Sequence, residues 1–228
     1  MKTPRAPRQL PLARKAGWGG RREGAGRKRK DGQRGSGVPH LRRPPLAARN
    51  PVHVTLKVRR EVWSLRSARS VRALKHSFLA LKQAQAAAGA LRVVHFAILS
   101  NHLHLIVEAR DRVALSRGLQ SLEIRMARAL NASMERKGPV FADRFHAHIL
   151  KTPTEVGRAL RYVLGNAAIH AARAGLAAPA ADALTSEAMD CTTPPVTWLL
   201  FAGFRLEQRP GAPPGAGVPG VKSHAVVR

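Results

Sequence analysis

A short apolar run that carries two histidines, residues 100–108 (Ser-Asn-His-Leu-His-Leu-Ile-Val-Glu), limits what this chain can fold into. Its length and its Leu, Ile and Val content predict a buried or half-buried β-strand. Because strand side chains alternate between faces, His102 and His104 project to one side and the intervening apolar residues to the other. Two imidazoles about 6.6–7 Å apart along a strand can converge on one divalent cation. The alternative is that one histidine is exposed and the other simply packs.

Charge and composition restrict the class of partner. The chain has 228 residues, enough for one or two domains, and its 44% hydrophobic content suffices for a core. It carries 40 Lys and Arg against 13 Asp and Glu, a net charge of +27. Such an excess favours a polyanion, above all nucleic acid. No stretch reaches the roughly 18 apolar residues of a membrane span, so we expect no membrane partner.

The compartment follows from cysteine usage and from the N-terminus. Cys191 is the single cysteine, which excludes an intramolecular disulfide and is typical of a reducing compartment. The N-terminal residues contain no apolar segment of the secretory kind. We therefore expect a cytoplasmic, nucleoid-associated protein.

Residues 1–49 predict a disordered basic arm. They contain 15 Lys and Arg and 2 acidic residues, interrupted throughout by Pro and Gly. At the centre of the arm stand Arg27, Lys28, Arg29 and Lys30, which we expect to contact DNA phosphates without sequence preference. A purely solubilising tail is the alternative.

The remaining pattern alternates strands with helices. We expect strands at 52–58, 91–98, about 102–108 and 140–150, and helices at 69–88, at 111–135 with Asp111 as N-cap, and from 152 to about 174. The first six elements predict an α+β fold, a ferredoxin-like split βαβ antiparallel sheet with two helices on one face. The additional C-terminal helix must then lie elsewhere, and it carries the only tyrosine.

That tyrosine, Tyr162, stands four residues before Asn166 and eight before His170, so a continuous helix would place all three on one face. A phenol held beside a metal-bound phosphate is a covalent nucleophile. Its free pKa is about 10, so it needs a cation or a base nearby. The carbonyl oxygen of Asn166 would join His102 and His104 as a third ligand. The alternative is a half-buried aromatic residue whose hydroxyl binds water.

Three segments carry a family resemblance. Residues 94–107 resemble the His-hydrophobic-His (HUH) strand of single-tyrosine transposases that act on single-stranded DNA. Residues 140–145 resemble the strand that precedes the tyrosine helix. Residues 160–166 and 173–176 resemble the Tyr-Ile-x-x-Asn-Pro…Arg-Ala-Gly-Leu segment of the relatives associated with repetitive extragenic palindromes (REP). The resemblance covers roughly residues 51–176.

The resemblance implies a ferredoxin-like catalytic domain and a mechanism. It implies that His102, His104 and Asn166 bind Mg²⁺ or Mn²⁺. It also implies that Tyr162 attacks a DNA phosphate, leaving a 5′-phosphotyrosine link and a free 3′-hydroxyl that later steps rejoin. The sequence departs from the relatives at Ala167, which stands where they have proline. The resulting prediction is a DNA transposase, a metal-dependent endonuclease and ligase of single strands. The alternative is a non-cleaving protein that binds single-stranded DNA or RNA hairpins on the same fold.

Three domains follow, with residues 1–49 as the arm, 50–176 as the catalytic domain and 177–228 as an extension that is disordered from about 209. Within the extension, the apolar residues 196–204 would dock as a strand or short helix, or serve as a partner surface.

The expected partner is hairpin-forming single-stranded DNA, and both a monomer and a homodimer stay open. In the catalytic domain we expect DNA contacts from Arg144, His146, Arg158 and Arg161. The other histidines are candidates for DNA contact or proton transfer, although each is more typical of a structural position. They are His53, His95, His148 and His170, together with His146.

Overall fold

A computed structural model describes residues 43–86, 90–166, 183–186 and 188–207. The predicted basic arm, with Arg27, Lys28, Arg29 and Lys30, lies outside these residues. His170 and the segment from 209 onward also lie outside them.

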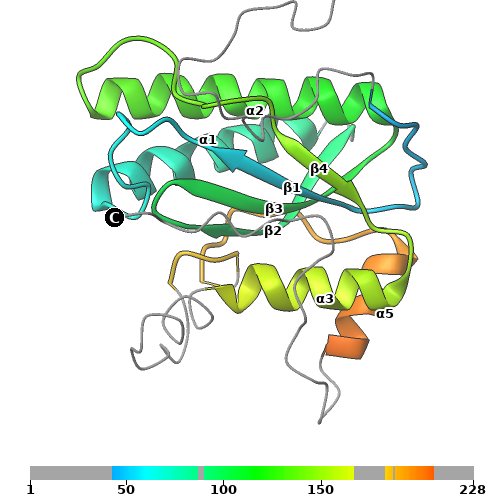
Figure 1. Cartoon of the computed structure of the whole chain (residues 1–228). Helices are drawn as coiled ribbons and strands as arrows, with labels where there is room; N and C mark the ends of the chain where they lie inside the picture. Colours follow the sequence, from blue (N-terminus) through cyan, green and yellow to red (C-terminus); the bar gives the residue numbers. More distant parts are fainter. Residues whose placement is uncertain (1–42, 87–89, 167–182, 187, 208–228) are drawn as a thin grey trace, which may run out of the picture. The chain divides into compact units, whose positions relative to one another are not determined.

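The described chain forms four strands and four helices, shown in Figure 1. In chain order they are β1 (Val52–Lys57), α1 (Ala68–Ala86), β2 (Leu91–Ile98), β3 (His102–Ala109), α2 (Arg112–Ser133), β4 (His146–Ile149), α3 (Pro153–Leu164) and α5 (Trp198–Glu207). The strands make one antiparallel sheet in the order β2-β3-β1-β4. In this order β3 is inserted between β1 and β2, the split βαβ arrangement. The ferredoxin-like α+β prediction is confirmed.

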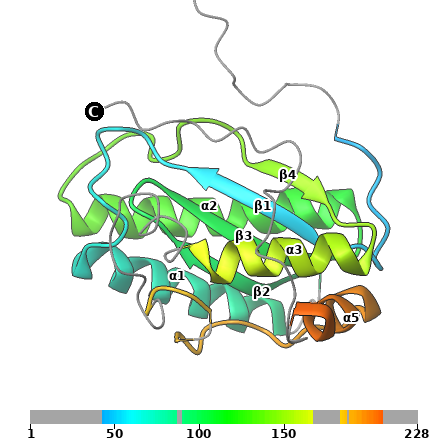
Figure 2. The same cartoon turned by 60° about the horizontal axis from the view of Figure 1, so that its bottom comes forward.

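Helices cover both faces of the sheet. α1 and α2 lie on one face, and α3 runs across the other beside α5 (Figures 1 and 2). The alternation of β3 explains the two layers, because Leu103 and Leu105 enter the core under α1 and α2. Ile106 enters a second core formed with α3 and α5. The third long helix therefore lies on the face that the first two leave open, as the sequence predicts.

Polar caps define where the helices begin. The carboxylate of Asp111 accepts a hydrogen bond from the backbone N–H of Ala114 at 2.8 Å, which confirms the predicted N-cap of α2. At the start of α3, the hydroxyl of Thr152 accepts from the N–H of Glu155 at 3.2 Å, and the Glu155 carboxylate accepts from the N–H of Lys151 at 2.7 Å. These caps fix the beginning of the helix that carries Tyr162.

The predicted helix from 152 to about 174 is interrupted at Gly165. α3 ends at Leu164 with Gly165 as its C-cap, and Asn166 beyond the cap is again helical. Residues 167–174 of the predicted helix lie outside the described residues. The N–H of Gly165 still bonds to the carbonyl of Arg161 at 2.9 Å, but glycine is a poor residue with which to continue a helix. Gly165 thus stands between α3, which carries Tyr162, and the helical residue Asn166.

The predicted strand 140–150 is also shorter in the structure. Phe141 makes one isolated bridge to Val58, residues 142–144 bend, and only His146–Ile149 pair with β1. Arg43 holds the chain just before the strand. Its Nη2 donates to the carbonyl of Phe145 at 2.7 Å, and its guanidinium lies 3.6 Å from the centre of the Phe145 ring.

The apolar residues 196–204 dock as a helix, α5. Leu200 is buried and Gly203 lies against α3, where a Cβ would stand 3.0 Å from the backbone nitrogen of Gly157. The buried carboxylate of Glu108 accepts hydrogen bonds from the residues that lead into α5. Within the described residues, none of the helices combines the length and the apolar character that crossing a membrane requires.

Candidate functional site

The predicted histidine pair converges at the start of β3. The Nε2 atoms of His102 and His104 lie 3.1 Å apart, and their rings meet edge to face with centres at 4.8 Å. Two nitrogen ligands at right angles on a cation, each about 2.1 Å from it, would be about 3.0 Å apart. The separation fits two ligands of one cation, and it equally fits a hydrogen bond between the rings.

Neighbouring oxygens set the tautomers of the pair. The amide oxygen of Asn101 lies 2.7 Å from Nδ1 of His102, and because this oxygen only accepts, Nδ1 carries the proton. The neutral ring then has its lone pair on Nε2, toward His104. Nδ1 of His104 lies 3.2 Å from the hydroxyl of Thr55, whose oxygen can accept a hydrogen bond in the same way. Partners of this kind orient the imidazoles that bind metals in proteins.

His53 on β1 joins the pair. It is buried, and its Nε2 lies 3.1 Å from Nδ1 of His104. Burial lowers its pKa to about 4, with a smaller contribution from the neighbouring His148 and His146, so it is neutral at pH 7. The sequence contains one signal for this position, since His53 and Thr55 share a strand face. Its significance depends on the β1–β3 register, which pairs Thr55 with His104.

Tyr162 lies over the same histidines. Its ring centre is 5.0 Å from that of His104 and 6.0 Å from that of His53, with both contacts edge to face. The apolar face of α3 produces this placement. Val163 is buried in the core between α3 and the sheet, and Tyr162 packs at the edge of this core. The fold therefore brings the Tyr162 ring to His104, which in turn contacts His102.

Asn166 is the least expected member of the predicted set. Its side chain is 1% exposed, yet neither its Oδ1 nor its Nδ2 has a hydrogen-bond partner. An unpartnered buried amide destabilises the folded state by about 1–3 kcal/mol, and a bound ligand would remove that cost. Among the described residues, the histidines of this site included, no three His, Cys, Asp or Glu side chains are arranged to hold a metal ion. The amide oxygen of Asn166 stays a predicted ligand beside the two imidazoles, a donor set that divalent cations accept.

The predicted DNA-contacting residues occupy two elements. Arg158 is exposed on α3, and Arg161 is half-buried in its last turn. Arg144 is exposed in the bend before β4, where its N–H donates to the carboxylate of Asp143 at 2.7 Å. His146 is exposed at the start of β4. The basic charge of these residues is thus carried by α3 and by the segment around the edge strand.

Comparison with known proteins gives a likeness of fold. No protein-family model and no curated protein matches the sequence. Among solved structures, a REP-associated tyrosine transposase bound to a REP hairpin matches with a TM-score of 0.47 and 14% sequence identity. The match covers 60% of this chain and 75% of that one. At this identity the similarity concerns the fold alone.

Proposed function

We propose that this protein cleaves and rejoins single-stranded DNA, with Tyr162 as the covalent nucleophile and hairpin-forming strands as the substrate. One observation supports this above the others: the Tyr162 ring lies 5.0 Å from that of His104, whose Nε2 lies 3.1 Å from Nε2 of His102. A phenol beside two convergent imidazoles combines a nucleophile with candidate metal ligands.

The chemistry divides into two transfers. In the first, the phenolic oxygen of Tyr162 forms a bond to phosphorus while the bond from phosphorus to the 3′-oxygen breaks. The phenol loses a proton and the departing 3′-oxygen gains one, so no proton is consumed. In the second, a 3′-hydroxyl attacks the 5′-phosphotyrosine and releases the phenol. Each transfer forms one phosphorus–oxygen ester bond as it breaks another. Joining the strands therefore needs no nucleoside triphosphate.

The site's own residues would hold a divalent cation, Mg²⁺ or Mn²⁺. His102 and His104 would bind through Nε2 and Asn166 through Oδ1. A cation bound there polarises a phosphate and offsets the charge of its oxygens. Asn101 and Thr55 orient the two rings, and Nε2 of the neutral His53 contacts Nδ1 of His104.

Covalent capture tests the proposal. We would incubate the full chain with end-labelled single-stranded hairpin oligonucleotides, in Mn²⁺ and in EDTA, and analyse denaturing gels. We expect a Mn²⁺-dependent protein–DNA adduct that disappears in Tyr162→Phe and in His102→Ala. Because Tyr162 is the only tyrosine of the chain, peptide mapping of the adduct has one acceptable answer.

A matched control separates chemistry from folding. His76 is exposed on α1, on the other face of the sheet, and His76→Ala should leave the adduct unchanged. Tight hairpin binding with no adduct in any metal would exclude the nuclease and leave the non-cleaving binder.

A further inference from the structure

The loop that follows β1, residues 59–67, exposes an indole at the end of the sheet where His102 begins β3. We call it the tryptophan loop. Val62 and Leu65 are buried in the main core, while Trp63 between them is 51% exposed. Exposing a large ring from an anchored loop forgoes burial energy, which is typical of a contact surface.

Hydrogen bonds attach the tryptophan loop to the end of β2 and to the turn that precedes His102. The N–H of Leu65 donates to the carbonyl of Ser100 at 2.8 Å, and Nη1 of Arg66 donates to the carbonyl of Ile98 at 2.8 Å. Just before the loop, the N–H of Val58 donates to the carbonyl of Asn101 at 3.0 Å. Asn101 is the residue whose amide orients His102. The same residue therefore contacts both the start of the loop and the candidate site.

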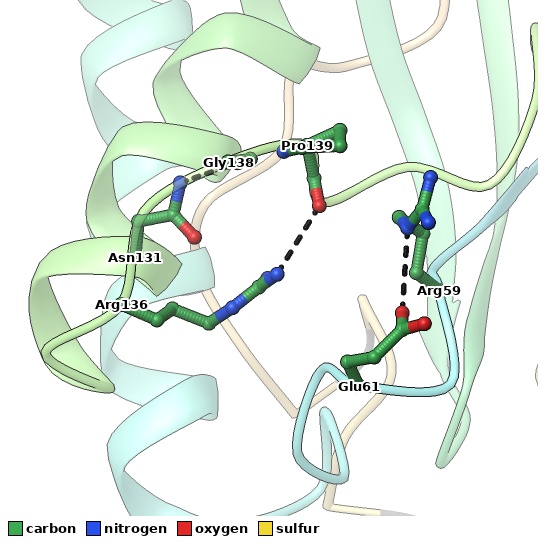
Figure 3. A network of polar contacts seen from close by, with 6 residues as sticks. All are labelled: Arg59, Glu61, Asn131, Arg136, Gly138 and Pro139. Atoms are coloured by element: carbon green, nitrogen blue, oxygen red, sulfur yellow. Dashed lines mark hydrogen bonds and ion pairs between the residues drawn. The ribbon is translucent and has the colours of Figure 1, made fainter.

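The connection between α2 and β4, residues 134–145, is hydrogen-bonded to the tryptophan loop. The N–H of Arg59 donates to the carbonyl of Val140 at 2.9 Å. Figure 3 shows how the connection between α2 and β4 is held there. Asn131 donates to the carbonyl of Gly138 at 2.9 Å, and Arg136 donates to that of Pro139 at 3.3 Å.

The basic side chains of the two loops differ in how far they can contact a ligand. Arg59 is paired with Glu61 at 3.3 Å and faces it in Figure 3. Arg60 and Lys137, by contrast, are exposed, and Nη1 of Arg136 is covered with no hydrogen-bond partner. Exposed cations and an exposed aromatic ring on two hydrogen-bonded loops supply the combination that binds single-stranded nucleic acid, in which bases stack on rings and cations pair with phosphates.

We propose that the tryptophan loop binds single-stranded DNA, with an unpaired base stacked on Trp63 and flanking phosphates contacted by Arg60 and Lys137. This inference rests on the proposed function, because it places the strand beside His102. It assigns the loop a role in holding the unpaired DNA that enters the site, separate from the residues that would react.

Binding without cleavage tests the loop directly. In EDTA, we would measure fluorescence anisotropy of a labelled oligodeoxythymidine of about 20 nucleotides with the full chain. Since stacking of a base on an aromatic side chain is worth about 1–3 kcal/mol, Trp63→Ala should raise Kd about 5- to 150-fold. Trp63→Phe should retain much of the affinity because it preserves a stacking face.

The chain offers a matched control. Trp198 on α5 is even more exposed, at 70%, and Trp198→Ala should leave Kd unchanged. A 2-aminopurine base in the strand should be quenched on binding to the wild type and not on binding to Trp63→Ala. Arg60→Gln and Lys137→Gln should each reduce the slope of log K against log salt by about 0.7.

The outcomes separate this inference from the proposed function. Unchanged Kd in Trp63→Ala, or an equal loss in Trp198→Ala, would overturn the loop assignment even if the Mn²⁺-dependent adduct forms. Trp63-dependent binding in EDTA with no adduct in Mn²⁺ would support the loop and overturn the nuclease. If Trp63 instead bound a protein partner, Trp63→Ala would leave the Kd for DNA unchanged.

Discussion

The carboxylate of Glu108 on β3 receives the chain that leads into α5, accepting hydrogen bonds from the N–H and the hydroxyl of Thr197 at 2.8 and 2.6 Å. The N–H of Val196 adds a third donor at 3.0 Å. Glu108 is 3% exposed, so donors rather than water satisfy its charge. Because α5 packs on α3, this carboxylate supports the helix that carries Tyr162.

Replacing that carboxylate should destabilise the protein. Glu108→Ala removes a charged acceptor and leaves the Thr197 and Val196 donors unpartnered, so the free energy of unfolding should fall by about 2–4 kcal/mol. Urea denaturation measures the change. Glu61→Gln, which alters an exposed carboxylate, is the control and should leave stability nearly unchanged. Equal stability of Glu108→Ala and wild type would contradict a supporting role.

The crossing of α3 and α5 should not tolerate a side chain at Gly203. A Cβ there would overlap Val156 and lie 3.0 Å from the nitrogen of Gly157, so Gly203→Ala should cost about 1–3 kcal/mol. If the crossing positions Tyr162, the rate of adduct formation should also fall while Kd for DNA stays constant. Trp198→Ala on the same helix should change neither quantity. A variant with lowered stability and an unchanged rate would limit the crossing to a structural role.

Asn166 should have opposite effects on stability and on metal binding. Asn166→Leu removes a buried amide that has no hydrogen-bond partner, so stability in EDTA should rise by about 1 kcal/mol. Mn²⁺ should raise the melting temperature of the wild type, because a ligand that binds only the folded state stabilises it. That rise should shrink in Asn166→Leu, vanish in His102→Ala and persist in His76→Ala. A full rise in Asn166→Leu would remove the amide from the ligand set.

Glu123 on α2 should contribute stability that is lost as the pH rises. Burial raises the pKa of this carboxyl to about 7, and the neighbouring Arg43 offsets part of the increase. The folded protein therefore holds a proton there that the unfolded chain releases near pH 4.5, so this contribution declines between about pH 4.5 and 7. Allowing for partial solvent exposure, the decline is about 1–2 kcal/mol.

Urea denaturation of the wild type and of Glu123→Gln at pH 5 and pH 8 isolates this contribution, because the lowered pKa of His53 makes stability rise over part of the same range. The wild type should lose about 1–2 kcal/mol relative to Glu123→Gln between the two pH values. Glu61→Gln should keep the pH dependence of the wild type, since the pKa of Glu61 is lowered by its own backbone and by Arg59. An equal pH dependence in the wild type and in Glu123→Gln would contradict the role of Glu123.

Local pattern was sufficient for most of the fold. Alternation in β1 and β3, the periodicity of α1 and α2, and the caps at Asp111 and Thr152 each depend on residues within a few positions of one another. The order of these elements then leaves few topologies, because a split βαβ unit has one common arrangement. The same short-range logic placed His102 and His104 on one strand face.

The tertiary structure decided what no local pattern contains. His53 reaches His104 only through the register of two strands that are distant in the sequence, and Tyr162 reaches them only because α3 docks on the open face. The cap at Gly165 separates Asn166 from the helix that carries Tyr162. By itself, the sequence determined the elements, their order and the candidate nucleophile. Which side chains meet depends on strand register and helix packing, because these arise from contacts between distant parts of the chain.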